Sequence, residues 1–254
     1  MMISIEYFIF CVTVTGLVVG SFLNVCIYRI PKGISLNGNH GRSMCASCKK
    51  TLKWYDLVPV FSYLMLRGRC RDCQEKISKR YPVIELINAI LWGLCAYYYQ
   101  IEWKTAIACI FCSVLLVLSM IDWDTQEIPY RFQAIILGLG IVSLFLSESP
   151  TIGERLIGIV IVSVPMIIIT LIFDGFGGGD IQLMATSGFL LGYKVNVMAM
   201  VIGTILAAVI GSFLLKKKKD EAKVKMPFGP FLSLGLVSAM FWGTYIYDWY
   251  FSFF

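Results

Sequence analysis

The chain has 254 residues, of which 58% are hydrophobic and 15% charged, with a formal net charge of +6. Soluble domains carry roughly 25% charged residues, so this composition excludes a soluble globular protein and predicts an integral membrane protein. The single histidine, His40, lies in a polar stretch of the sequence. A serine or cysteine triad that depends on histidine is therefore excluded unless this loop reaches the site.

Apolar stretches long enough to cross a bilayer recur along the chain and predict about eight transmembrane helices. The sixth is the shortest. In order, the stretches are Tyr7–Tyr28, Val83–Tyr99, Ala106–Ile121, Phe132–Leu146, Ile157–Phe173, Ile181–Leu191, Val197–Leu215 and Phe231–Tyr247. Two pairs of glycines spaced four apart, Gly16 with Gly20 and Gly188 with Gly192, are typical of close helix packing.

The basic residues are distributed unevenly between the loops. Nineteen of the 22 lie in three segments: twelve in Arg29–Tyr81, six in Lys216–Lys225, and Arg131. With eight spans these segments all fall on one side, which the positive-inside rule identifies as the cytoplasm. We therefore expect a multi-pass protein of the cytoplasmic membrane. The basic run Lys216–Lys219 is interpreted as a topology determinant near lipid, so no nucleic-acid partner is expected.

One polar segment interrupts the apolar pattern between the first two spans. It contains two Cys-x-x-Cys pairs, Cys45 with Cys48 and Cys70 with Cys73, separated by 21 residues. This spacing is typical of a tetrahedral structural zinc site, and free or redox-active thiols are the alternative. The sequence thus predicts an all-α membrane protein with a small cytosolic insert that resembles a zinc ribbon. We expect three parts: residues 1–28, 29–81 and 82–254.

Several aspartates lie where apolar stretches meet polar loops, all on the side predicted to be cytoplasmic. Asp122 ends one stretch, and Asp180 follows three glycines and opens another, while Asp124 and Asp174 lie close by. Two neighbouring carboxyls share a proton, because ionising both is costly. The ionised one can activate water and the protonated one can polarise a carbonyl. Sequence position alone does not choose between the neighbouring aspartates.

The flanking residues select one pair through a family resemblance. A Gly-x-Gly-Asp sequence at Gly177–Asp180, with an aspartate six residues before an Ile-Pro pair, resembles the type IV prepilin peptidases, membrane aspartyl proteases of the GxGD class. Further stretches are similar to motifs of the same family, in the same order. They are Gly20–Val25 with Tyr28–Pro31, both cysteine pairs, Trp54–Tyr63 and Ser78–Glu85.

The resemblance implies that Asp122 and Asp180 are the catalytic pair. It implies an endopeptidase that removes the basic leader of prepilins or pseudopilins at the cytoplasmic face, and a possible second reaction, N-methylation with S-adenosylmethionine. The family often has lysine two residues after the second aspartate, where this chain has Gln182, and aspartate after Ile-Pro, where it has Tyr130. Neither departure affects the two aspartates.

The expected partners are therefore prepilin or pseudopilin substrates and membrane lipid. Acidic residues of the insert and of the following span are candidates for contacts with the basic leader: Asp56, Asp72, Glu75 and Glu85. Two other functions compete with the peptidase. One is a membrane-tethered zinc-binding module without catalysis. The other is a transporter with a proton relay, which requires acids deep within its spans.

Overall fold

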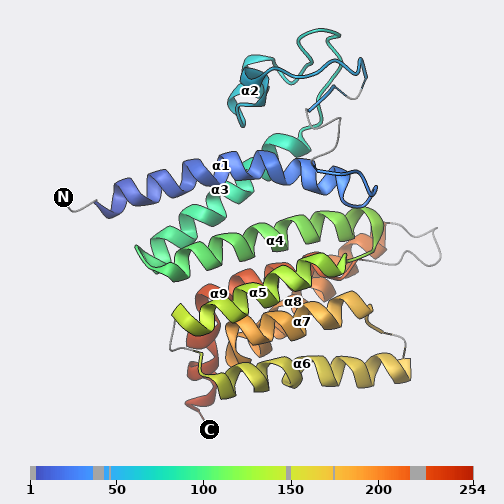
Figure 1. The fold of residues 1–254 in the computed structure, drawn as a ribbon. Coiled ribbons are helices and arrows are strands. Elements are labelled where there is room, and N and C mark those ends of the chain that lie inside the picture. The colour runs from blue at the N-terminus through green and yellow to red at the C-terminus, as the bar shows by residue number, and fades with distance from the viewer. Residues whose placement is uncertain are drawn as a thin grey trace. The chain divides into compact units, whose positions relative to one another are not determined.

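The computed structural model describes residues 4–36, 43–45, 47–146, 150–173, 175–217 and 227–253. His40, Asp174 and residues 218–225 of the second basic loop lie outside the described residues. In the part described there are nine α-helices, one short 3-10 helix and no β-strand (Figure 1). In chain order these are α1 Ile5–Arg29, η1 Trp54–Leu57, α2 Phe61–Met65, α3 Arg80–Tyr99, α4 Trp103–Thr125, α5 Tyr130–Leu146, α6 Ile152–Phe173, α7 Gly178–Leu191, α8 Tyr193–Lys217 and α9 Gly229–Phe251.

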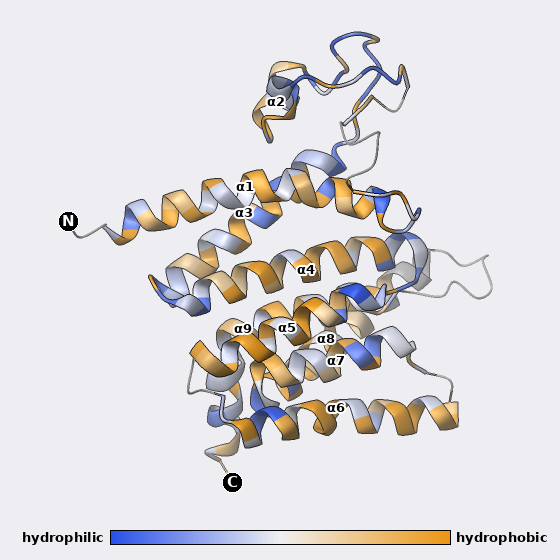
Figure 2. Ribbon diagram, viewed as in Figure 1, coloured by the Kyte–Doolittle hydropathy of each residue, from blue (hydrophilic) through white to orange (hydrophobic). Residues whose placement is uncertain are grey.

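The all-helical class predicted from the sequence is confirmed. Each of the eight predicted stretches lies within one helix, namely α1 and then α3 to α9. Five of these helices (α1, α4, α6, α8 and α9) are long and apolar enough to cross a membrane, and α5 is a shorter apolar helix. Figure 2 shows apolar residues along the long helices and more polar residues in the segment that carries α2. The chain is a multi-pass membrane protein.

The described residues form two compact units, Met1–Val117 (unit 1) and Leu118–Phe254 (unit 2), which divide within α4. The three-part division expected from the sequence stays a prediction. In unit 1, α1 packs against α3 at Gly16 and Gly20 of α1. A Cβ atom at Gly16 would lie 2.8 Å from Trp92 Cβ, and one at Gly20 would lie 2.8 Å from Glu85 Cα. The predicted packing role of this pair is confirmed, because only glycine permits so close an approach.

In unit 2, α7 lies between α5 and α6 (Figure 1). Gly158 of α6 and Gly188 of α7 bring the two backbones into direct contact, since a Cβ atom on either glycine would overlap the other's carbonyl oxygen. Asn196 of α8 then donates from Nδ2 to Gly158 O at 2.9 Å and to Met184 O at 3.1 Å. The next glycine, Gly192, has φ +81°, a left-handed conformation that ends α7 before α8 begins. These contacts fix α7, which carries Asp180 at its opposite end.

Candidate active site

Asp122 lies in the last turn of α4 and is buried, with 5% of its surface exposed. The backbone N–H of Gly229 donates to Asp122 Oδ2 at 2.9 Å. Gly229 is the first residue of α9, so the carboxylate lies at a helix N-terminus, where backbone N–H groups and the helix dipole favour negative charge. A Cβ atom at Gly229 would lie 2.7 Å from Oδ2, so this approach requires glycine.

Asp180 lies in the first turn of α7 and is also buried, with 8% exposed. Its Oδ2 accepts a hydrogen bond from Gly177 N at 3.3 Å. Its Oδ1 has no hydrogen-bond partner among the residues that the structure describes. The adjacent Gly179 allows a second segment to approach, since a Cβ atom there would lie 2.7 Å from Ile128 Cβ. The glycine run therefore has a steric function at this site.

The two carboxyl groups line one cavity of about 350 Å³, formed entirely within unit 2. Its lining residues are Asp122, Gln126, Glu127, Ile128, Gly177, Gly178, Gly179 and Asp180. Asp180 precedes the apolar stretch that begins at Ile181. Burial, and secondarily the negative charge of Asp122, raise the pKa of Asp180 to about 6. The structure thus brings the two aspartates predicted from the sequence into one partly water-accessible site.

The turn after α4 supplies the remaining wall of the cavity. Gln126 has φ +57° and donates from its backbone N–H to Asp122 O at 2.9 Å, which ends the helix and turns the chain. Glu127 and Ile128 follow and line the cavity. Sequence reasoning missed these residues as site residues. Their position, at or directly before the Ile-Pro pair that follows the aspartate, was the available signal.

The neighbouring candidates differ in their environment. Asp124, two residues after Asp122, is exposed, and Asp174 lies outside the described residues. The two positions that depart from the family pattern, Gln182 and Tyr130, are both exposed, and neither lines the cavity. Burial beside a glycine-shaped cavity therefore distinguishes Asp122 from Asp124 on grounds independent of the family pattern.

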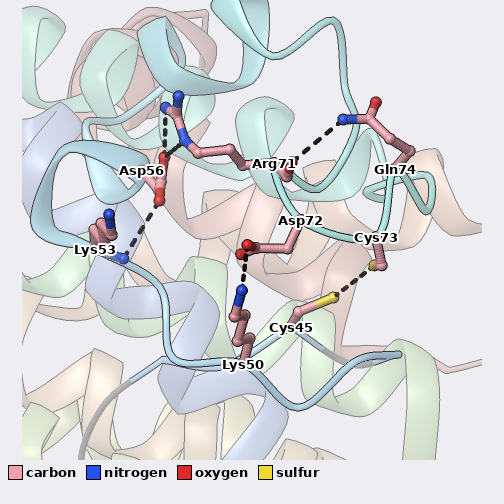
Figure 3. A network of polar contacts seen from close by, with 8 residues as sticks. All are labelled: Cys45, Lys50, Lys53, Asp56, Arg71, Asp72, Cys73 and Gln74. Atoms are coloured by element: carbon pink, nitrogen blue, oxygen red, sulfur yellow. Dashed lines mark hydrogen bonds and ion pairs between the residues drawn. The ribbon is translucent and has the colours of Figure 1, made fainter.

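Acidic residues considered for leader contacts mostly have partners inside unit 1. Asp56 accepts two hydrogen bonds from Arg71, at 2.9 and 2.8 Å, and Asp72 accepts one from Lys50 at 2.6 Å (Figure 3). Glu85 is buried and accepts a hydrogen bond from Val60 N at 2.8 Å. These three carboxylates hold the insert together and join it to α3.

Cys45, Cys48, Cys70 and Cys73 form one cluster. Their sulfur atoms all lie within 4.8 Å of one another, and the Cys45 and Cys73 sulfurs are 3.8 Å apart (Figure 3). A tetrahedron with Zn–S bonds of about 2.3 Å has S–S edges of about 3.8 Å, whereas a disulfide bond measures about 2.05 Å. The four thiols are free, and their arrangement fits a metal ion.

The two halves of the cysteine cluster have the same local backbone. Lys49 N donates to Cys45 O at 3.0 Å, and Gln74 N donates to Cys70 O at 3.1 Å. Lys49 and Gln74, each directly after the second cysteine of a pair, both have φ +58°. Each pair therefore forms the same tight turn, which directs two thiols towards the other pair. This repetition supports a metal-binding function for the whole set.

Comparisons with known proteins agree with this geometry. The Bacterial Peptidase A24 N-terminal domain matches residues 14–99, and the Type IV leader peptidase family matches residues 109–212. A prepilin leader peptidase/N-methyltransferase of Stutzerimonas stutzeri is 30% identical over 97% of this chain and 94% of the relative. One of Pseudomonas putida is 32% identical over 95% of this chain and 93% of the relative.

A relative with a different name is as similar. A type 4 prepilin-like proteins leader peptide-processing enzyme of Escherichia coli O78:H11 is 32% identical over 90% of this chain and 92% of the relative. No solved structure matches the chain. Because the two family matches together include both aspartates and all four clustered cysteines, and whole-length relatives agree, the chain belongs to the type IV leader peptidase family.

Proposed function

We propose that the protein is a membrane aspartyl endopeptidase that removes the basic leader of type IV prepilins or pseudopilins. The observation that carries this proposal is the pair of buried carboxyls, Asp122 and Asp180, in one cavity. Neither is saturated by hydrogen bonds from the described residues, since one backbone N–H donates to each and Asp180 Oδ1 has no partner. Such a pair can hold one shared proton and bind water between the two groups.

In the proposed mechanism Asp122 is the ionised member, supported by Gly229 N–H, and the molecules that react carry the shared proton on Asp180, whose pKa is raised to about 6. Asp122 takes a proton from water as the oxygen attacks the scissile carbonyl, while Asp180 gives its proton to the carbonyl oxygen. When the tetrahedral diol collapses, Asp122 protonates the leaving nitrogen and Asp180 recovers a proton from a diol hydroxyl. The cycle returns both groups to their initial state without a metal or a covalent intermediate.

We further infer that the site faces the cytoplasm. Asp122 lies in the last turn of α4, beside the loop that leads to Arg131, and its partner Gly229 follows the basic loop Lys216–Lys225. Both loops belong to the set that holds nineteen of the 22 basic residues, which the positive-inside rule places in the cytoplasm. A leader that remains inside while its helix enters the membrane would reach this site directly.

Peptidase activity is tested by co-expression with a prepilin-like substrate, with leader loss scored by gel shift. Wild type should cleave, whereas Asp122→Asn and Asp180→Asn should not. Asp124→Asn is the matched control, because it makes the same change at an exposed position one half-turn away. Retained cleavage in Asp180→Asn would reject the assignment of Asp180, whereas no cleavage by the wild type would favour the non-catalytic module or the transporter.

Glu127 is the residue that we propose recognises the positive charge of the leader. It is an exposed carboxylate that lines the same cavity as the two aspartates. By contrast, Asp56, Asp72 and Glu85, considered earlier for this role, are engaged within unit 1. Attraction between exposed opposite charges is modest, so we expect a change in substrate affinity and little change in the chemical step.

A charge exchange tests this assignment. Glu127→Lys should slow cleavage of a basic leader about tenfold, and Glu127→Gln should have a smaller effect. A leader whose lysine is replaced by glutamate should restore cleavage by Glu127→Lys. If no position in the leader gives such restoration, Glu127 does not contact the basic residues.

We propose that the four clustered cysteines hold a structural zinc ion. The insert is too small for a core of its own, and structural zinc contributes on the order of 10–16 kcal/mol to folding. Elemental analysis should give one zinc per chain in the wild type and a large loss in Cys45→Ser. Full thiol reactivity without bound zinc would favour the redox alternative.

The relatives named prepilin leader peptidase/N-methyltransferase favour a second activity. We propose that the chain also methylates the newly formed N-terminus with S-adenosylmethionine, which would supply the methyl group. The residues that bind this cofactor are unassigned. Transfer of labelled methyl groups to a substrate supplied already cleaved would establish the activity separately from proteolysis, and absence of transfer would reject it.

A further inference from the structure

The insert displays large apolar side chains on its surface. Four of them, which we call the α2 face, are Trp54 in η1 and Phe61, Leu64 and Met65 in α2. Their exposed fractions are 80%, 60%, 66% and 70%, respectively. Positions 61, 64 and 65 lie on one side of a helical turn. A cluster of this kind on an otherwise polar segment marks an interaction site more often than chance exposure.

Backbone hydrogen bonds fix the position of the α2 face. Val60, which precedes α2, has φ +58°, a strained conformation for a β-branched residue. Its N–H donates to the buried Glu85 of α3 at 2.8 Å. On the inner side of α2, Gly68 N donates to Tyr63 O at 2.8 Å, and a Cβ atom at Gly68 would lie 2.8 Å from the Tyr63 hydroxyl. The inner side is therefore packed, and the apolar side chains lie on the outer one.

The same contacts place α2 at the start of a predicted span. Glu85 lies in the second turn of α3, whose apolar stretch begins at Val83, and Asn24 Nδ2 of α1 donates to Tyr81 O at 3.2 Å. Tyr81, Val83 and Leu86 are themselves exposed, at 44%, 48% and 44%. The beginning of the span and the insert joined to it through Val60 therefore both expose apolar side chains.

The segment that carries the α2 face is strongly basic. Residues 49–80 contain nine lysines and arginines and three acidic residues. Two of the three acids, Asp56 and Asp72, are in ion pairs with Arg71 and Lys50. Clustered basic residues beside tryptophan and other apolar side chains are typical of segments that lie on anionic lipid.

We propose that the insert docks on an anionic lipid surface through the α2 face, with Trp54, Phe61, Leu64 and Met65 at the boundary between head groups and acyl chains. The hydrogen bond that joins the insert to the exposed start of α3, together with the positive charge of the insert, favours lipid as the occupant. This docking would fix the cysteine-containing insert at the membrane surface. It is independent of the peptidase mechanism.

Photo-crosslinking in lipid nanodiscs tests the proposal with the full-length protein. A benzophenone amino acid replaces Phe61 or Leu64, and Glu75, an exposed residue of the same insert, is the matched control position. In discs with phosphatidylglycerol we expect lipid adducts at 61 and 64 at least about tenfold above those at 75, and fewer in discs of phosphatidylcholine alone. Adducts at the level of position 75 would overturn the proposal. So would a shift of the adducts from lipid to an added prepilin-like peptide.

A second measurement does not depend on the crosslinker. The fluorescence of Trp54, obtained as the difference between wild type and Trp54→Phe, should be quenched by brominated phosphatidylglycerol. The double change Leu64→Glu with Met65→Glu should remove this quenching. Limited proteolysis establishes that the insert stays folded. Quenching of Trp54 that persists in the folded double variant would also contradict the proposal.

Discussion

Buried ionisable groups at the two ends of unit 2 differ in how many hydrogen-bond partners they have. At one end Arg155 of α6 is completely buried, and the N–H groups of its Nε and Nη1 atoms lie within hydrogen-bonding distance of five acceptors. They are Pro150 O, Gly140 O, Ser143 Oγ, Phe189 O and Leu190 O. The last two are carbonyls at the C-terminal end of α7, where a cation is favourable. At the other end of α7, Asp180 accepts one backbone N–H bond.

The contrast separates a charge that holds helices together from the pair that we propose is catalytic. Among the described residues, Nη2 is the one guanidinium nitrogen of Arg155 without a partner. The other nitrogens of the guanidinium hold α5, α6 and α7 together. The aspartates instead retain unused acceptor capacity beside a cavity. A buried polar group left unsatisfied costs stability, and such sites persist where they serve a function. Substitutions at the two ends should therefore have opposite consequences for activity and for stability.

The largest expected effect is at the aspartate end. Asp180→Asn should lower the cleavage rate about 10⁴-fold, since loss of one member of a catalytic pair typically has this size of effect. Its unfolding midpoint in detergent should be unchanged or raised, because the neutral amide removes the cost of ionising a buried carboxyl beside Asp122. Thermal unfolding and cleavage assays on the same preparations check both. Marked destabilisation of Asp180→Asn would contradict the contrast between Asp180 and Arg155.

Arg155→Met should show the reverse pattern. Five acceptors lose their cationic donor, and we expect a loss of about 3 kcal/mol in the free energy of unfolding. The protein that remains folded should cleave at close to the wild-type rate per molecule, because Arg155 contacts the C-terminal end of α7, whereas Asp180 lies at its N-terminal end. Arg155→Lys, which keeps the charge, should recover part of the stability. A stable Arg155→Met variant would contradict this interpretation.

Gly229→Ala should sharpen the comparison by displacing Asp122 without removing it. The added Cβ atom would meet Oδ2 at 2.7 Å, so the carboxylate must move and its hydrogen bond from the α9 backbone must weaken. Small displacements of catalytic groups lower rates by about 10²-fold. Gly138→Ala, where the new atom meets nothing within 4 Å, is the matched control and should cleave normally.

The smallest effect concerns pH. A carboxyl whose pKa is raised to about 6 binds more protons in the folded state than in the unfolded state, where its pKa is about 3.9. Asp180 therefore contributes a stability loss as pH rises from about 4 to about 6, of about 2 kcal/mol. As pH rises across this range, we expect the unfolding midpoint of Asp180→Asn to increase relative to that of wild type. Asp124→Asn should follow wild type at every pH.

Much of the fold was predictable because it depends on local composition. Runs of apolar residues predicted all eight long helices. Cysteine spacing predicted the cluster that the structure shows. The choice of Asp122 over Asp124 depended on family flanks, since both residues lie beside the same span. Helical phase decides which of them is buried, and the structure shows one buried and the other exposed.

By itself, then, the sequence determined a multi-pass helical membrane protein, the cysteine pairs and the family motifs around two aspartates. Only the tertiary structure decided that Gly229, 107 residues along the chain, donates to Asp122. It also decided that Glu127 lines the cavity while Asp56 and Asp72 are paired elsewhere. The physical reason is that hydropathy and residue spacing depend on the environment of each segment alone. Contacts between residues far apart in sequence depend instead on which helix faces pack together.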